Sequence, residues 1–261
     1  MINSKNVKII RTKTRAEGGI TPQELEAMQA HCDLWIKRAM RTEAITPEKI
    51  IPAIEGLYEV SGLQKPKKVI VVPSPMVMAM AGAFAGAILW WQKNKKPATD
   101  AATDAATDDA TRDATSWKKL ALELAKGNSE LATFMMQCCR LWYKCYAGGN
   151  MWAGGECYYT ACRDILGLKL PIFEKYKYWE QAAIEGGFRY MHEDFCMVSD
   201  FPEFIKKDEK NRPHCATGAS HRWRDGWELY HINGVRFEKV EFDKFTSGKM
   251  DALDIMYEKN Q

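Results

Sequence analysis

A four-residue repeat, which runs from Ala98 to Trp117 between two segments of ordinary globular composition, constrains the fold more than any other feature of this chain. Its five copies read ATDA, ATDA, ATDD, ATRD and ATSW. A period of four is close to the 3.6 residues of a helical turn, so equivalent positions trace a slowly winding stripe along a helix. Alanine favours a helix, and its small side chain lets a neighbouring surface approach closely. We therefore expect the repeat to form a packed structural helix.

Two alternatives for the repeat stay open. The segment has five aspartates against one arginine and no large apolar residue before Trp117, a composition that is also typical of a flexible acidic linker. The spacing of Asp108, Asp109 and Asp113 looks like the motif with which isoprenoid synthases bind magnesium and diphosphate. Two carboxylates on one helical face can hold a hydrated magnesium ion. The repeat itself explains this spacing without a ligand.

Composition and charge indicate an ordinary folded protein. The chain has 261 residues, of which 46% are apolar, enough to fill the core of one large or two small domains. Its 37 basic and 34 acidic residues give a net charge of +3, so charge alone does not indicate a nucleic-acid partner, although a local basic patch could exist. The eight cysteines form no C-x-x-C pair, and the N-terminus has no secretory leader. We expect reduced thiols, mostly in the core, and a cytoplasmic protein.

The apolar stretch Met76–Trp91 is compatible with two structures. Its sixteen uncharged residues, Gly82 and Gly86 four residues apart, and a terminal tryptophan pair followed by lysines are typical of a membrane helix. At about 1.5 Å per residue the stretch spans about 24 Å, which is short of the roughly 30 Å hydrocarbon core. We therefore favour a buried helix after a strand at 69–72, with the glycines allowing a neighbour to approach, and we do not expect a membrane partner.

The rest of the chain before and after the repeat predicts helices. Thr21 and Glu24 form a capping box at the start of the first helix. Thr46, followed by proline, opens a second helix, and Gly62 is placed to end it. Further helices are expected at 117–125, 131–145 and 158–166, and a last one near Met250–Tyr257.

From Phe188 the apolar period changes to two, which predicts a strand. On a continuous strand, His192, Asp194 and Cys196 occupy successive positions of one face. With His214 they form a candidate polar cluster that could hold zinc, although no cofactor is predicted otherwise. The alternative breaks the strand at 192–194 as a polar turn. A nucleophilic pair of a histidine with Cys196 or Cys215 is a further alternative, and no signal identifies its base.

The segment 212–237 has the richest local pattern. The pairs Asp225-Gly226 and Asn233-Gly234 favour tight turns and predict a β-meander. Aromatic and basic side chains occur on both faces and could form a surface that stacks on a base, a sugar or an aromatic side chain of a partner. This candidate binding surface consists of His221, Arg222, Trp223, Arg224 and Trp227. In the alternative, the tryptophans close a small core and the arginines are solvated.

Three motifs, in this order, resemble an uncharacterised domain family of bacteria and their phages. They are KVIVVPSP at 68–75 with its apolar helix, the tetrapeptide array, and DGWELY at 225–230 leading to NGVR at 233–236. The resemblance covers roughly 46–237. Relatives in that family often read His-Gly-Val-Arg-Pro where this chain has NGVRF, so no histidine is present for a role at that position. The resemblance implies this domain order and a soluble intracellular protein, and it transfers no catalytic residue.

These patterns predict an α+β fold with a mainly helical body, a helix built from the repeat, and a small C-terminal antiparallel β-meander. We divide the chain into an N-terminal extension at 1–20, a helical region with one short strand at 21–97, the repeat at 98–117, a second helical region at 118–187, and the β-meander with a terminal helix at 188–261.

The sequence favours a non-enzymatic binding or interaction protein, because no nucleophile, base and orienting residue occur together at a recognisable spacing. Its partner is an unknown macromolecule or small ligand, and no heptad pattern indicates an oligomeric state. One alternative is an enzyme acting on a nucleotide, nucleic acid or other phosphorylated substrate, with arginines holding phosphate and a histidine moving protons. Its cleft would gather His192, Asp194, His214, His221, Arg222 and Arg224. The other alternative is a protein attached to a membrane through Met76–Trp91.

Overall fold

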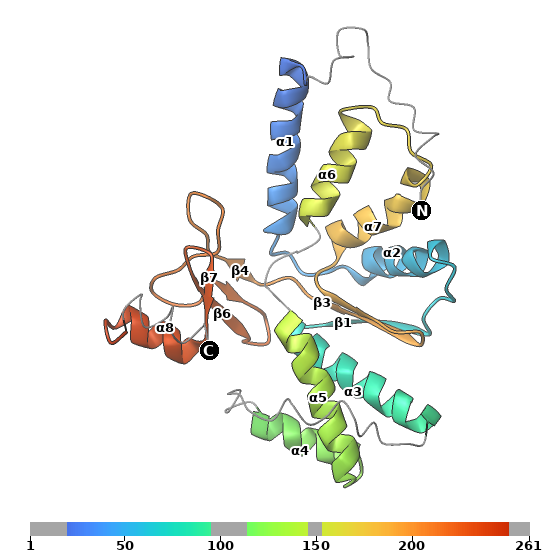
Figure 1. Ribbon diagram of the computed structural model, residues 1–261, viewed down its shortest axis with the longest axis vertical. Coiled ribbons are helices and arrows are strands. Elements are labelled where there is room, and N and C mark those ends of the chain that lie inside the picture. Colours follow the sequence, from blue (N-terminus) through green and yellow to red (C-terminus); the bar gives the residue numbers. More distant parts are fainter. Residues whose placement is uncertain (1–19, 95–113, 146–152, 251–261) are drawn as a thin grey trace.

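The computed structural model describes residues 20–94, 114–145 and 153–250 (Figure 1). Within these residues the fold is α+β and mainly helical, as predicted. The helices are α1 (Pro22–Ala39), α2 (Pro47–Val60), α3 (Pro75–Asn94), α4 (Ala114–Leu124), α5 (Ser129–Cys145), α6 (Ala153–Asp164), α7 (Phe173–Glu185) and α8 (Lys239–Thr246). The strands are β1 (Lys68–Val72), β2 (Arg189–Met191), β3 (Phe195–Ser199), β4 (Phe204–Ile205), β5 (His221–Arg222), β6 (Glu228–Ile232) and β7 (Val235–Phe237).

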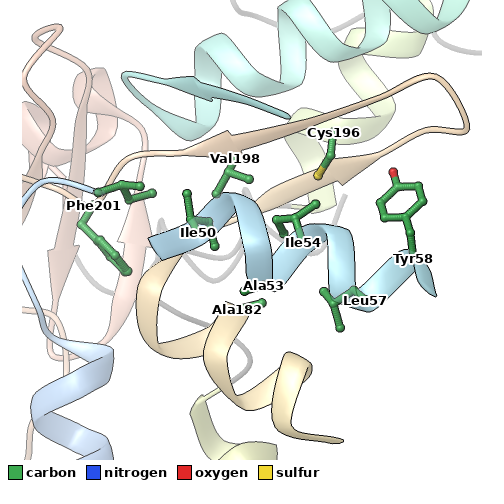
Figure 2. Packing of buried hydrophobic residues seen from close by; sticks show 10 residues of the cluster. Ile50, Ala53, Ile54, Leu57, Tyr58, Ala182, Cys196, Val198 and Phe201 are labelled. Carbon is green, nitrogen blue, oxygen red and sulfur yellow. The ribbon is translucent and has the colours of Figure 1, made fainter. Parts of the chain in front are cut away.

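Strand β3 forms the centre of the first sheet, whose order is β1-β3-β2. It runs parallel to β1, with Val72 opposite Ser199, and antiparallel to β2. All five of its residues are buried. Side chains of a strand alternate between faces, so Cys196 and Val198 pack on α2, as Figure 2 shows, while the alternate residues pack on α3. The sheet is thus the middle layer between helices.

Helix α3 contains the apolar stretch Met76–Trp91 and is covered on two sides. Met78 packs with the first sheet, whereas Phe84 and Ala87 pack with α4 and α5. By length and composition α3 could cross a membrane, and 44% of its most apolar 18-residue segment is buried inside the protein. A helix in the core of a soluble protein can have the same length and apolar composition. This packing is compatible with a soluble protein.

The two glycines of α3 face β2, as expected for positions where a neighbour approaches closely. A Cβ atom at Gly82 would lie 2.9 Å from the ring of Tyr190, and one at Gly86 would lie 2.7 Å from the hydroxyl oxygen of the same residue. Real Cβ atoms do not tolerate contacts this short. The absence of side chains at these positions therefore lets Tyr190 pack along α3.

The predicted ends of the first two helices are confirmed. The backbone N–H of Glu24 donates to the Thr21 hydroxyl at 3.2 Å, and the Thr21 N–H donates to the Glu24 carboxylate at 2.9 Å, which completes the capping box of α1. Helix α2 begins at Pro47, and Gly62, with a φ of 72°, follows its end. Both helices thus begin where the local sequence signals place them, and α2 also ends there.

The prediction of a continuous strand from Phe188 onward is wrong, and the alternative prediction of a polar turn at 192–194 is confirmed. The chain reverses at 192–194, where the His192 N–H donates to the Phe195 carbonyl at 2.9 Å, and β2 and β3 form a hairpin. Because the chain turns back, Tyr190 packs on α3, whereas Cys196 packs on α2. The alternation that suggested one strand therefore comes from two antiparallel strands.

Two further predictions concern residues that the structure does not describe in full. The repeat lies outside the described residues as far as Asp113, and its last copy, 114–117, opens α4. The expected final helix near Met250–Tyr257 also falls outside them, since the description ends at Met250. Helix α8 was not expected, although the side chains of Glu238 and Glu241 form a capping box at its start.

The predicted β-meander comprises β4 to β7, which pair as antiparallel neighbours in sequence order. Asn233 and Gly234 have positive φ values of 50° and 87°, which a tight turn between β6 and β7 requires. Phe242 of α8 packs against Tyr230, with ring centroids 5.0 Å apart. Leu229 instead joins the cluster between α3 and the first sheet. Both faces of the meander are therefore covered by other parts of the chain.

Helices α2 and α7 meet at Gly56, where an added Cβ atom would overlap the ring of Tyr178. We expect Gly56→Ala to destabilise the protein by about 1–3 kcal/mol, because the overlap outweighs the gain of up to about 1 kcal/mol in helix propensity. Gly155→Ala in α6 is the matched control, since nothing lies within 4 Å of its added Cβ. The control should be neutral or slightly stabilising in urea unfolding. Equal effects of the two substitutions would contradict this packing.

Candidate functional site

The five residues of the predicted binding surface do not form one exposed surface. His221 and Trp223 are each only 1% exposed, and their rings stack at 6.0 Å. Trp227 is partly buried against Trp223, with ring centroids 4.6 Å apart. Arg222 is exposed and forms ion pairs with two glutamates, at 3.1 Å with Glu203 and at 4.0 Å with Glu228. Burial of the large indole and imidazole rings in the core removes two of the five from solvent.

Arg224 connects the meander to the helical body. Its guanidinium donates to the Asp200 carboxylate at 3.0 Å, to the Phe201 carbonyl at 3.0 Å and to the Thr42 carbonyl at 2.7 Å. The other oxygen of Asp200 accepts from the backbone N–H of Ile45 at 2.8 Å. The planar guanidinium offers several donors in fixed directions, which suits such a junction. Arg224 therefore holds the meander against the helical body.

A buried polar network lies inside the meander. The Ser220 hydroxyl oxygen is 2.7 Å from Nδ1 of His231, 3.0 Å from Nδ1 of His221 and 3.0 Å from the Leu229 carbonyl oxygen. A hydroxyl has one hydrogen to donate, so if it donates to the carbonyl, both imidazoles must donate to it. Burial, and then the neighbouring His231, lower the pKa of His221 to about 3. A serine hydroxyl that accepts hydrogen bonds from both histidines has no base to take its proton and is not activated as a nucleophile.

The candidate polar cluster is dispersed. His192 and Asp194 lie together in the β2–β3 turn, where Lys67 donates to the Asp194 carboxylate at 2.6 Å. Cys196 points to α2, and burial raises its pKa to about 12 (Figure 2). His214 lies between β4 and β5, and its Nδ1 accepts from a backbone N–H at 3.0 Å. Among the described residues, no group of three or more His, Cys, Asp and Glu could hold a metal ion.

The cleft proposed for the enzyme alternative is therefore not assembled by the described contacts. His192 and Asp194 belong to the first sheet, His221 lies inside the meander, and Arg224 is bound at the Asp200 junction. A catalytic constellation needs its groups within reach of one reacting atom. Arginines and histidines at these positions do not share a site for phosphate binding and proton transfer.

Of the two cysteines considered as nucleophiles, Cys215 has the more polar surroundings. Its sulfur lies 3.8 Å from the Lys206 ammonium and 3.6 Å from the Thr217 hydroxyl. Burial raises the pKa of this thiol, but hydrogen bonds from Thr217 and Gly218 together with the charge of Lys206 outweigh it, so the pKa is lowered overall. Cys196 is surrounded by apolar side chains instead.

A buried acidic residue, Glu156 of α6, was not singled out from the sequence. It is 5% exposed, and one of its carboxylate oxygens has no hydrogen-bond partner in the described part of the chain. Burial raises its pKa to about 7, with Arg189 opposing this shift and Glu180 adding to it. The Arg189 guanidinium is also buried and lies 5.2 Å over the Trp179 ring. A carboxyl group in this state can gain or lose a proton near neutral pH.

Sequence pattern could not identify Glu156, because a glutamate in the first turn of a helix is an ordinary feature. Its pKa depends on burial and on the charges of Arg189, which lowers it, and Glu180, which raises it, and these two residues come from β2 and α7. The surroundings that set its pKa are therefore formed only in the folded chain.

An exposed aromatic surface lies on α6 and α7. Tyr158 is 68% exposed and Tyr159 is 51% exposed. Their rings are in edge-to-face contact at 5.7 Å, and Tyr159 contacts Tyr176 at 5.5 Å. Phe173 continues this series of rings at 6.4 Å from Tyr176, and Ile172 beside it is 43% exposed. We call these residues the tyrosine surface: Tyr158, Tyr159, Ile172, Phe173 and Tyr176.

The tyrosine surface is rigidly supported and has a basic border. Arg163 of α6 donates to the Glu180 carboxylate of α7 at 2.7 and 3.2 Å, which fixes one helix against the other. Exposed lysines follow the loop and the first turns of α7: Lys169, Lys175 and Lys177. Residues next to Tyr176 project about 100° to either side of it, so two of these lysines flank the aromatic side of α7.

We expect Arg224→Ala to lower the free energy of unfolding by about 1–3 kcal/mol. The substitution removes the three hydrogen bonds that the guanidinium donates, and it leaves the Asp200 carboxylate without its positively charged partner. Arg222→Ala is the matched control two residues away, and its exposed ion pairs should contribute less than about 1 kcal/mol. Urea unfolding of both variants measures the difference. A larger loss for Arg222→Ala would contradict the junction.

The raised pKa of Glu156 predicts that its contribution to stability falls as pH rises from about 4.5 to about 7, because the folded state keeps a proton that the unfolded state loses. The total loss is on the order of 3 kcal/mol. Glu156→Gln cannot titrate, so its stability relative to the wild type should increase across this window. Urea unfolding of both proteins at matched pH values measures this difference. His221 makes stability rise with pH in the wild type and in the variant alike, so its contribution cancels when the two are compared. A difference that does not change with pH would contradict the buried carboxyl.

Comparison with known proteins adds no assignment. No protein-family model, curated protein or solved structure matches this chain. The resemblance to the bacterial and phage domain family stays a prediction.

Proposed function

We propose that this protein binds single-stranded nucleic acid and that the tyrosine surface of α6 and α7 is the binding site. The observation that carries the proposal is the exposure of Tyr158 and Tyr159, 68% and 51%, in a series of rings bordered by lysines. Single-stranded nucleic acids are bound by aromatic side chains that stack on bases, combined with basic groups that follow the backbone. The proposal keeps the binding function expected from the sequence and moves it from the meander to the helices.

Exposure of large rings supports a binding role, because an aromatic side chain left in water forgoes the free energy of burial. The rings of the tyrosine surface contact each other, so their positions are set before a ligand arrives.

The local charge supports a nucleic acid as the class of partner. The net charge of +3 is too small to indicate a nucleic-acid partner for the protein as a whole. At this surface, however, three exposed lysines accompany the rings, against the exposed Glu174 and against Asp164, which is bound to Arg163 at 2.6 Å. A single-stranded nucleic acid suits both kinds of side chain, because its acidic backbone can pair with the lysines and its flat bases can stack on the rings. The location that we propose for this activity is the cytoplasm, where the cysteines stay reduced.

The test uses a fluorescently labelled oligothymidylate and measures binding by fluorescence anisotropy. Tyr158→Ala and Tyr159→Ala should each weaken binding about 5- to 150-fold, since stacking on one base contributes about 1–3 kcal/mol. Replacement of Lys169, Lys175 and Lys177 by glutamine should reduce the magnitude of the slope of log affinity against log salt by about 2.

Leu25→Ala on α1 is the control, because this side chain is also apolar and 63% exposed but lies outside the tyrosine surface. It should leave the affinity unchanged, and all variants should keep the wild-type melting temperature. Absence of oligonucleotide binding by the folded wild type, or binding that survives both tyrosine substitutions, would remove the proposal. Binding of a protein partner alone at this surface would contradict the nucleic-acid assignment.

A further inference from the structure

Two thiols from distant parts of the chain face each other between α1 and α6. The Cys157 thiol donates to the sulfur of Cys32, and the two sulfurs are 3.8 Å apart. Cys32 is exposed and Cys157 is partly buried. We propose that these residues are a modification site at which a hydroperoxide forms a reversible disulfide bond. The inference does not depend on the proposed function.

The two helices are held in register next to this pair. Nε2 of His31 lies 2.7 Å from the Thr160 hydroxyl oxygen, and the Trp35 indole N–H donates to the same oxygen at 3.0 Å. Trp35 is 2% exposed and packs with Ala153 and Ala183. These contacts lie within one helical turn of Cys32 and Cys157, so the sulfurs face each other in a fixed part of the structure.

The other described cysteines have different surroundings. Burial raises the pKa of Cys138, Cys139 and Cys196, and Cys215 is only 7% exposed. Among the seven cysteines whose side chains the structure describes, only Cys32 is exposed. Reactivity toward oxidants requires access, so a dissolved hydroperoxide meets Cys32 before the buried thiols.

The chemistry proceeds in two balanced steps. The Cys32 sulfur attacks the hydroperoxide, takes one oxygen as a sulfenic acid and releases the alcohol, or water if the oxidant is hydrogen peroxide. The Cys157 sulfur then attacks Cys32, loses its proton and expels water as the S–S bond forms. Burial raises the pKa of Cys157, so its thiol gives up the proton during this attack. A dithiol reductant returns both residues to thiols and becomes oxidised itself.

The bond would join residues 125 positions apart and fasten α1 to α6. Cross-links that close long loops restrict the unfolded chain most. We therefore expect the oxidised protein to melt several degrees above the reduced protein. Since reduced conditions are expected for these cysteines, the bond would form only while an oxidant is present.

The experiment exposes the purified protein to a small excess of hydrogen peroxide, blocks remaining thiols, and maps peptides by mass spectrometry. The wild type should yield a peptide pair joined through Cys32 and Cys157, which dithiothreitol separates. Cys157→Ser should give no cross-link and should instead carry a Cys32 sulfenic acid that dimedone captures. Cys162→Ser, a partly buried cysteine of the same helix, should cross-link like the wild type.

Three results would overturn the inference. The first is a modified Cys32 with Cys157 still free in the oxidised wild type. The second is a disulfide-linked dimer on a non-reducing gel that persists in Cys157→Ser. The third is a cross-linked protein that melts below the reduced one.

Discussion

The burial of β3 on both faces is the constraint on which the rest of this structure depends. Its backbone groups pair with β1 on one side and β2 on the other, while Cys196 and Val198 have no solvent exposure. A strand in this position needs a helix layer on each face. Helices α2 and α3 supply those layers, and the parallel pairing of β1 with β3 requires the long connection that carries α3 to α7.

The tyrosine surface follows from this arrangement. Helix α7 packs against α2 through Ala182, and so it is held on the first sheet (Figure 1). Helix α6 is then fixed to α7 by Arg163 and Glu180, and α1 is fixed to α6 by the contacts of Trp35 and Thr160. Each layer further from β3 buries fewer apolar side chains. The outermost helices therefore leave rings and a cysteine in solvent.

Local signals predicted much of the fold. The capping box of Thr21, the Asn233-Gly234 turn and the strand before the apolar helix all depend on residues that are close in sequence. The pairing of Val72 with Ser199 does not, since more than a hundred residues separate the two. The local pattern around His192 fitted one strand or two, and the packing of Cys196 on α2 decided between them.

The candidate site could be predicted less well than the fold, because exposure is a property of the folded chain. Arg224 is bound by carbonyls of Thr42 and Phe201, which the sequence does not bring near it. Tyr158 and Tyr159 have no sequence feature that distinguishes them from buried tyrosines. Their exposure appears only when α6 packs on α1 and α7.

Amide chemical-shift mapping with a short single-stranded oligonucleotide tests the central claim most directly, because it reports the binding position without a substitution. The account predicts that the shifted amides concentrate at Tyr158, Tyr159 and the first turns of α7. Shifts confined to the meander around Arg222, or no shifts at all, would contradict it.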